Sequence, residues 1–176
     1  MAKREFEVQE VKDGTLAGKK KKYSIDDYGE FAEIGGLILG TDHVDQNGKY
    51  HYFPYYFIQL PNANKGAERE YRLPGILHSF QTLKTILKHV DKKTLRRDLA
   101  AGLKVIGEFH SHLNKKVGLS EKDIKALERR VSKRGYWVIG ILTEKNRSKL
   151  KMSMKPYQKP GLKSKTNYNS IKRIQS

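Results

Sequence analysis

Hydrophobic residues alternate with polar ones, or form short runs, in several segments that are therefore predicted to be β-strands. Residues 35–44 and 50–60 form two such segments, and the Asp-Gln-Asn-Gly-Lys stretch between them is typical of a hairpin turn. Because Pro54 has no backbone N–H, we expect the second strand to lie at a sheet edge or to contain a bulge. Three later segments are also predicted strands: 104–112, 136–142 and 149–157.

Helical spacing follows Pro74, where apolar residues recur at intervals of three and four: Ile76, Leu77, Phe80, Leu83, Ile86, Leu87 and Val90. Residues 92–104 predict a second helix that ends near Gly102, and residues 120–135 predict a third. Ser24 is a candidate N-cap for a further short helix. Because helices interleave with strands, we expect a mixed α/β fold with a single sheet flanked by helices.

The two ends of the chain differ in composition from its middle. Residues 1–22 combine a brief alternation, which predicts an edge strand, with a Gly- and Lys-rich stretch that predicts a flexible loop. Residues 23–157 contain the periodic segments and suit one domain with a sizeable core. Residues 158–176 are polar and basic, and we expect them to form a loosely held tail.

The charge of the chain restricts its partners. A formal net charge of +17 attracts nucleic acid, anionic membranes or acidic proteins. Residues 145–176 contain ten Lys and Arg residues and no acidic one, but Lys dominates over Arg, so a solubilising role stays open. No segment approaches the roughly 20 apolar residues of a membrane span. The N-terminus lacks the apolar core of a secretory signal, so we expect a cytoplasmic protein with no membrane partner.

A candidate metal site emerges from the histidines, since the absence of cysteine restricts metal ligands to His, Asp and Glu. His110 and His112 lie one residue apart in a predicted strand, so their side chains point to the same face. Asp123 follows in the first turn of the next predicted helix. Two imidazoles and one carboxylate leave a fourth tetrahedral position for water, as is typical of catalytic zinc. We therefore expect a single zinc ion.

Simpler interpretations stay open for each part of this pattern. Ser120 and Asp123 fit a capping box, in which Ser120 caps the helix and Asp123 interacts with the helix dipole. Capping does not exclude metal binding, because the same helix start can direct Asp123 towards an ion. The aromatic segment 50–57 can stack on bases or can supply ordinary strand residues. The other four histidines are expected to be polar surface residues: His43, His51, His78 and His89.

The combined pattern resembles the core motif of the JAMM (MPN-plus) zinc metalloproteases. The His-Ser-His stretch at 110–112, seven intervening residues, Ser120, two more residues and Asp123 match the H-x-H-x7-S-x-x-D pattern of that family. The family also has a Glu before a Gly-Leu strand, and Glu33 in the stretch Ala-Glu-Ile-Gly-Gly-Leu corresponds to it. The likeness covers roughly residues 24–157.

The resemblance implies an MPN (cytidine-deaminase-like) architecture and cleavage of a peptide or isopeptide bond after the C-terminus of a ubiquitin-like or sulfur-carrier protein. It implies that zinc is bound by His110, His112 and Asp123. It further implies that Glu33 moves a proton from water to the leaving amine and that Ser120 hydrogen-bonds the oxyanion. The family includes deubiquitinases, so an isopeptidase is among the expected activities.

Two positions depart from the family pattern. Many members have Pro where this chain has Leu113, and an aromatic residue often stands where this chain has Glu108. Strand alternation places Glu108 on the face of the two histidines. It therefore stays open whether Glu108 binds the metal or supplies the base in place of Glu33.

Two other functions remain as hypotheses. One is a non-catalytic scaffold of the same fold that binds nucleic acid or an acidic protein complex through its basic surface and tail. The other, by analogy with RadC-like relatives, is a nuclease or DNA-repair protein. Peptide, isopeptide and thiocarboxylate-linked substrates all need the same metal chemistry, so the pattern does not distinguish between these scissile bonds.

Overall fold

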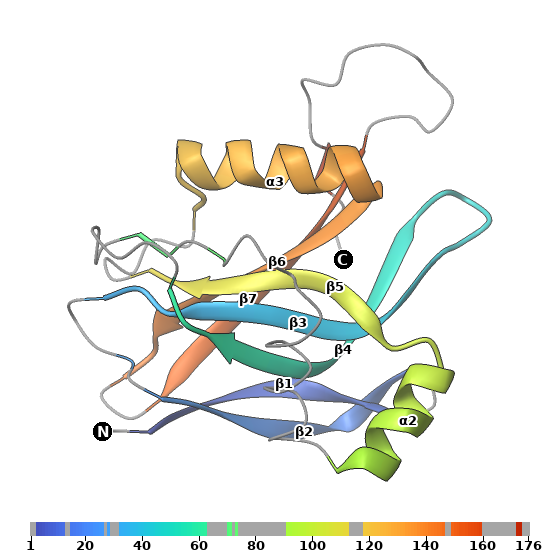
Figure 1. The fold of residues 1–176 in the computed structure, drawn as a ribbon, viewed down its shortest axis with the longest axis horizontal. Coiled ribbons are helices and arrows are strands. Elements are labelled where there is room, and N and C mark those ends of the chain that lie inside the picture. The colour runs from blue at the N-terminus through green and yellow to red at the C-terminus, as the bar shows by residue number, and fades with distance from the viewer. Residues whose placement is uncertain are drawn as a thin grey trace.

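The structure, a computed structural model, describes residues 3–12, 15–26, 28, 32–62, 70–71, 73, 91–112, 118–146, 149–159 and 172–173. These residues form eight strands and two helices (Figure 1): β1 (Arg4–Lys12), β2 (Thr15–Ile25), β3 (Gly35–Val44), β4 (Tyr50–Leu60), α2 (Lys92–Ala100), β5 (Lys104–Ser111), α3 (Glu121–Arg134), β6 (Tyr136–Glu144), β7 (Leu150–Gln158) and β8 (Lys172–Arg173). The helix expected after Pro74 lies outside the described residues.

The described strands form two sheets. Six strands make one sheet in the order β4-β3-β5-β6-β7-β8, and β1 pairs with β2 in a separate antiparallel hairpin. In the large sheet β5 and β6 run parallel, whereas the other described neighbours are antiparallel. In Figure 1, α3 lies across one face of the large sheet and the β1–β2 hairpin lies along the other. The strand that carries His110 is therefore central and covered on both sides.

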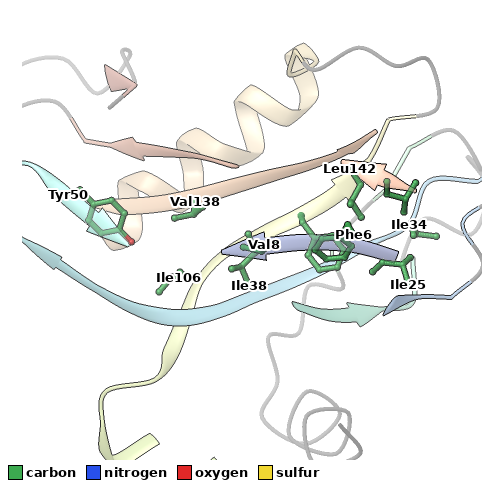
Figure 2. Close-up of a cluster of buried hydrophobic side chains, with 11 residues drawn as sticks. Phe6, Val8, Ile25, Ile34, Ile38, Tyr50, Ile106, Val138 and Leu142 are labelled. Atoms are coloured by element: carbon green, nitrogen blue, oxygen red, sulfur yellow. The ribbon is translucent and has the colours of Figure 1, made fainter. Parts of the chain in front are cut away.

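The hairpin packs its apolar face against the large sheet. Along β1, Phe6 and Val8 are buried while Glu5 and Glu7 are exposed, as expected for a strand with one covered face. Figure 2 shows this core, in which the hairpin meets residues of the large sheet and of the segment before β3: Ile34, Ile38, Ile106, Phe109, Val138 and Leu142. The N-terminal segment thus contributes to the same core as the central strands.

Helix α3 covers the opposite face through residues one helical turn apart. Leu127 and Val131 are buried and pack against residues of β6: Trp137, Ile139 and Ile141. The helix begins after Ser120, whose side chain accepts a hydrogen bond from the backbone N–H of Asp123, and ends at Gly135 with φ of 84°. The predictions of α3 and of α2, which ends two residues before Gly102, are confirmed.

The expected architecture, a single sheet flanked by helices as in MPN proteins, is wrong. The described residues are mainly strands, they form two sheets, and they contain only two helices, of 9 and 14 residues. The physical reason is that alternate residues of β1 are apolar. The hairpin therefore has an apolar face that packs against the large sheet, in the place where a helix was expected. None of the described helices is long and apolar enough to span a membrane.

Strand β2 was not expected from the sequence, which predicted a flexible loop and a helix capped by Ser24. Both predictions are wrong: Ser24 lies within β2, opposite Glu5 of β1. Long-range pairing with β1 overrides the polar composition of residues 19–22, whose lysine side chains are exposed. Lys21 also lies over the rings of Tyr23 and Tyr56, at 5.5 and 5.2 Å from their centroids.

The hairpin of β3 and β4 confirms the sequence prediction. Its turn is closed by backbone hydrogen bonds between Asp45 and Lys49 (2.9 Å) and between Gly48 and Asp45 (2.9 Å), and Gly48 has φ of 76°. Pro54 pairs with Gly40 next to a register shift, in the strand at the edge of the described sheet. The expected bulge and the expected edge position therefore both occur. Strands β5, β6 and β7 match the remaining predictions.

The basic tail expected at 158–176 is described at only four residues. The backbone N–H of Lys159 donates to the carbonyl of Gly135 at 2.8 Å, and β8 pairs with the end of β7. The remaining residues of this segment lie outside the described residues.

Candidate metal centre

His110 lies in the central strand β5, and His112 directly follows Ser111, the last residue of that strand. Its register pairs His110 with Gly35 of β3 and with Ile141 of β6, and the N–H of His112 donates to the carbonyl of Leu142 at 3.0 Å. Strand alternation directs both rings to the face that α3 covers, as the sequence predicted. The rings are 6% and 8% exposed, and their Nε2 atoms lie 2.9 Å apart. Two imidazole nitrogens therefore converge on one point.

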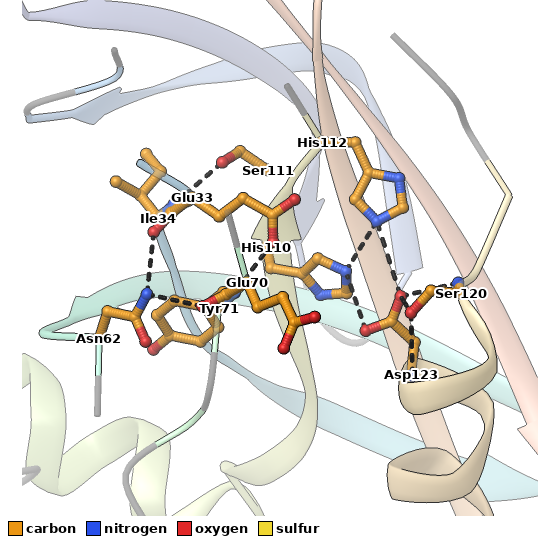
Figure 3. Close-up of polar contacts among 10 residues, drawn as sticks. All are labelled: Glu33, Ile34, Asn62, Glu70, Tyr71, His110, Ser111, His112, Ser120 and Asp123. Atoms are coloured by element: carbon orange, nitrogen blue, oxygen red, sulfur yellow. Dashed lines mark hydrogen bonds and ion pairs between the residues drawn. The ribbon is translucent and has the colours of Figure 1, made fainter. Parts of the chain in front are cut away.

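The third donor is Asp123, in the first turn of α3. Its Oδ1 lies 3.6 Å from Nε2 of His110, and its Oδ2 lies 3.8 Å from Nε2 of His112. The capping box is present as well, because Asp123 Oδ2 accepts from the backbone N–H and the hydroxyl of Ser120 at 2.8 and 2.7 Å. One side chain thus completes the helix cap and also faces the histidine pair (Figure 3).

These three residues form a group that could hold a metal ion. One donor atom from each of His110, His112 and Asp123 lies within 4.8 Å of the others. Donors about 2.0–2.1 Å from a tetrahedral zinc ion are ~3.3 Å from one another. The two Nε2 atoms are 2.9 Å apart, and they lie 3.6 and 3.8 Å from Oδ1 and Oδ2 of Asp123, respectively. The donor atoms are therefore close enough together to share one ion.

The pKa of Asp123 lies well below its usual range. Burial alone would raise this pKa, but the hydrogen bond and charge of His110 and the hydrogen bonds from Ser120 lower it by more. The carboxylate is consequently ionised at neutral pH, which is the state that a metal ligand requires.

Glu33 lies beside the histidine pair, at the residue before Ile34 and β3. Figure 3 shows its side chain extending towards His110. Its Oε2 accepts a hydrogen bond from the backbone N–H of Tyr71 at 2.9 Å. Burial raises the pKa of Glu33, and the charge of Asp123 adds to this effect, whereas the Tyr71 N–H and the two histidines oppose it. Glu33 is thus next to the three-donor group without belonging to it.

Glu108 lies on the histidine face, as alternation predicted, but its carboxylate pairs with α3. Its Oε2 is 3.4 Å from Nε of Arg130, and the side chain is 14% exposed. Burial raises the pKa of Glu108, while Arg130 and His110 oppose the rise. Glu108 is absent from the three-donor group found among the described residues.

Ser111, Asn62 and Tyr71 are functional candidates that the sequence did not indicate. The sequence pattern gave Ser111 no role beyond its place between the two histidines, although a small polar residue in a buried strand is a usable signal. It is completely buried and hydrogen-bonds both backbone polar groups of Ile34. Tyr71 and Asn62 reach Glu33 from the segment after β4, and no local pattern could have indicated that contact.

Two other histidines and the aromatic segment have structural explanations. His43 and His51 stack across the β3–β4 hairpin, and His51 Nε2 lies 2.9 Å from Asp45 Oδ2. The aromatic residues of β4 pack on both faces of the sheet, with Phe57 in the hairpin core and Tyr56 in a second cluster. These contacts account for the two histidines as surface residues and for the aromatic side chains as ordinary strand residues. The other two, His78 and His89, lie outside the described residues.

Comparison with known proteins assigns no family to this chain. No protein-family model matches the sequence, and no curated protein matches it. Among solved structures, the solution structure of protein DSY2949 from Desulfitobacterium hafniense is similar over 82% of this chain and 76% of that chain, with 14% sequence identity and a TM-score of 0.37. A likeness at that level carries no information about function, so the function has to be inferred from the site itself.

Proposed function

We propose that the protein is a zinc-dependent hydrolase in which a single ion is bound by His110, His112 and Asp123. The observation that carries the proposal is the convergence of their donor atoms, since one atom from each residue lies within 4.8 Å of the others. The donors are two nitrogens and one oxygen, which leaves a fourth position for water, as in catalytic zinc sites. The match to the JAMM sequence pattern supports a metallopeptidase as the reaction class.

In this function Glu33 is the general base. Zinc, when bound, supplies the Lewis acidity that lowers the pKa of a water molecule and polarises a carbonyl. Glu33 takes the proton of the attacking water and passes it to the leaving amine. Its raised pKa supports this role, because a higher pKa makes the carboxylate a stronger acceptor for the proton of water. Its hydrogen bond to Tyr71 N–H holds one carboxylate oxygen and leaves the other for the proton.

Ser120 has a second role beyond capping α3. The residue is exposed, and its hydroxyl donates to Asp123 Oδ2 at 2.7 Å. A hydroxyl rotates at little cost, so Ser120 can donate instead to the tetrahedral oxyanion of an amide under attack. The backbone N–H of Ser120 retains its bond to Asp123, which keeps the helix start in place.

The proposed substrate is a peptide or isopeptide bond after the C-terminus of a ubiquitin-like or sulfur-carrier protein, and the proposed location is the cytoplasm. The JAMM resemblance supports this choice of substrate. The net charge of +17 supports a partner with an acidic surface, which such a field attracts.

Metal content and cleavage together test this function. Purified protein should contain stoichiometric zinc by elemental analysis and should cleave a ubiquitin-like protein joined through its C-terminal glycine to the lysine of a peptide. Glu33→Gln should retain the zinc and lower kcat by about 10²- to 10⁴-fold. Glu7→Gln, at an exposed position of β1, is the matched control and should change neither quantity. Protein without zinc, or unchanged turnover in Glu33→Gln, would refute the proposal.

The exposed lysines of β2 favour one alternative, a non-catalytic scaffold for nucleic acid or an acidic protein complex. In that function, single-stranded RNA or DNA binds with an affinity that falls steeply with salt. The binding should also be unaffected by chelation of the metal. Absence of binding to either probe at moderate salt excludes the nucleic-acid form of this alternative.

A further inference from the structure

We propose that Ser111 is a positioning residue for Glu33, an inference that rests on the proposed function. The side chain of Ser111 is 0% exposed. Its Oγ accepts a hydrogen bond from the N–H of Ile34 at 2.9 Å, and its own N–H donates to the carbonyl of Ile34 at 2.7 Å. Ser111 therefore satisfies both backbone polar groups of the residue that follows Glu33 in the chain.

The strand register explains why this contact directs Glu33. Gly35 pairs with His110 in antiparallel register, so Ile34 lies opposite Ser111 and Glu33 lies opposite His112. Side chains alternate along the extended chain, so Ile34 points into the hairpin core while Glu33 points to the histidine face. The two hydrogen bonds between Ser111 and Ile34 thus extend the β3–β5 pairing by one residue, and Glu33 is the next residue towards the N-terminus.

The other supports of Glu33 come from a different part of the chain. Tyr71 N–H binds its carboxylate, and Asn62 Nδ2 lies 3.5 Å from its carbonyl oxygen and 2.9 Å from that of Glu70. The Tyr71 ring packs against Gly35, where any larger residue would clash with it, since a Cβ atom at this position would lie 2.6 Å from the ring. These contacts tie Glu33 to the segment after β4. Ser111, through its hydrogen bonds to Ile34, connects the backbone next to Glu33 to the strand that carries His110.

Removing Ser111 Oγ has a specific cost. Ser111→Ala leaves the buried N–H of Ile34 without an acceptor, and a buried donor without a partner favours a displaced backbone. Ser111→Thr keeps an oxygen at the same position. The histidine ligands point to the opposite side of the strand from Ser111, so zinc binding should not depend on it.

The test compares kcat, KM, zinc affinity and amide exchange in matched variants. With the lysine-linked ubiquitin-like probe, Ser111→Ala should lower kcat about 10- to 100-fold with KM nearly unchanged, since a base misplaced by 1 Å costs that much. Zinc affinity, measured by chelator competition, should be unchanged, and hydrogen exchange at the Ile34 amide should accelerate. Ser111→Thr should restore most of kcat. Tyr50→Phe, which removes another buried hydroxyl at the far end of the β3–β4 hairpin from the histidines, should retain wild-type kcat.

Each result decides a different point. If Ser111→Ala keeps wild-type kcat while Glu33→Gln loses it, the positioning role is wrong and the proposed function stands. If zinc-loaded wild-type protein cleaves no probe, the proposed function fails and the positioning role fails with it. Should the alanine variant not fold, Ser111→Cys keeps a similar volume with only a weak sulfur acceptor. It should lower kcat in the same direction, and full activity in that variant overturns the inference.

Discussion

The acidic side chains around the histidine pair differ in pKa because their neighbours differ. Hydrogen bonds and charge from His110 and Ser120 hold the pKa of Asp123 low despite its burial. Burial raises the pKa of Glu33 and of Glu108, and the opposing contacts do not cancel it. Carboxylates whose surroundings separate their pKa values in this way can take different tasks at one pH. At the residue scale, the proposed function therefore assigns metal binding to Asp123 and proton transfer to Glu33.

A first prediction concerns Glu108→Gln in metal-free protein. Because burial raises the pKa of Glu108 in the folded state, the folded protein holds its proton to higher pH than the unfolded chain does. The contribution of Glu108 to the stability of the wild-type protein should therefore decrease as pH rises from about 4.3, the ordinary value for Glu, through the raised value. Glutamine does not titrate, so the stability of the variant relative to wild type should increase from pH 4 to pH 7.

Urea unfolding at a series of pH values in the presence of a chelator measures this difference. Glu7→Gln, on the exposed face of β1, is the matched control for loss of a carboxylate. A relative stability of Glu108→Gln that does not change with pH, or that falls as pH rises, contradicts the prediction. The comparison begins at pH 4, below the ordinary pKa of Glu, where the charge at position 108 differs least between the two proteins.

The start of α3 provides a prediction at the scale of one element, because Ser120 has a capping role and a proposed catalytic role. Replacing an N-cap serine with alanine costs about 1 kcal/mol, whereas glycine costs only a few tenths. Ser120→Ala should therefore be less stable than Ser120→Gly. Both variants lack the hydroxyl, so both should lose turnover to the same extent, about 10²-fold for an oxyanion donor.

Thermal unfolding and steady-state kinetics of the two Ser120 variants separate these roles. If activity follows stability, so that Ser120→Gly is nearly as active as wild type, the hydroxyl acts only through the helix. Equal losses of kcat in variants of unequal stability support the oxyanion role.

Elements with local signals could be predicted from the sequence. The capping box at Ser120 and Asp123 and the helical pattern of residues 120–135 predicted α3, and the Asn-Gly turn predicted the β3–β4 hairpin. Strand β2 could not be predicted in this way, because its lysines carry no apolar pattern and its pairing with β1 sets its structure. The Ser24 prediction failed for the same reason: a serine before acidic residues is a good N-cap only if the chain does not continue as a strand.

In the candidate metal centre too, only the features that depend on local sequence signals could be predicted. The group of His110, His112 and Asp123 followed from alternation in one strand and from the first turn of the next helix, which are local rules. The surroundings of Glu33 did not follow, because Tyr71 and Asn62 reach it from a segment that only the folded chain brings close. The pairing of Glu108 with Arg130 likewise depends on how α3 lies over the sheet.

At the scale of the whole molecule, two covering layers hold the central strands. Helix α3 packs on the face that carries the histidines, and the β1–β2 hairpin packs on the other. The sequence predicted helices on both faces of this sheet, but one face is covered by the β1–β2 hairpin. The apolar residues of β1 could have packed against a helix or a sheet, so the sequence pattern of residues 4–12 did not determine which of the two they contact. The site consequently depends on α3 for Asp123 and on the hairpin core for the position of Ile34.

The net charge of +17 leads to a last prediction, which concerns the rate of encounter with an acidic substrate. Deleting residues 160–176 removes no acidic side chain and four basic ones: Lys163, Lys165, Lys172 and Arg173. The deletion retains Lys159, whose backbone N–H donates to the carbonyl of Gly135. Steering depends on long-range charge, so kcat/KM should fall several-fold, within about 10-fold, at low salt. Because the tail is not part of the proposed site, kcat should stay near its wild-type value.

Replacing the four exposed lysines at residues 19–22 of β2 with glutamine is the matched control, since it removes the same formal charge from a paired strand. If the field of the whole molecule steers the substrate, both changes should lower kcat/KM by similar factors. Both differences should disappear above roughly 0.3 M salt, where the Debye length is shorter than about 6 Å. A loss confined to the deletion and insensitive to salt would indicate a specific docking contact, and a large fall in kcat would show that the tail acts on the chemical step.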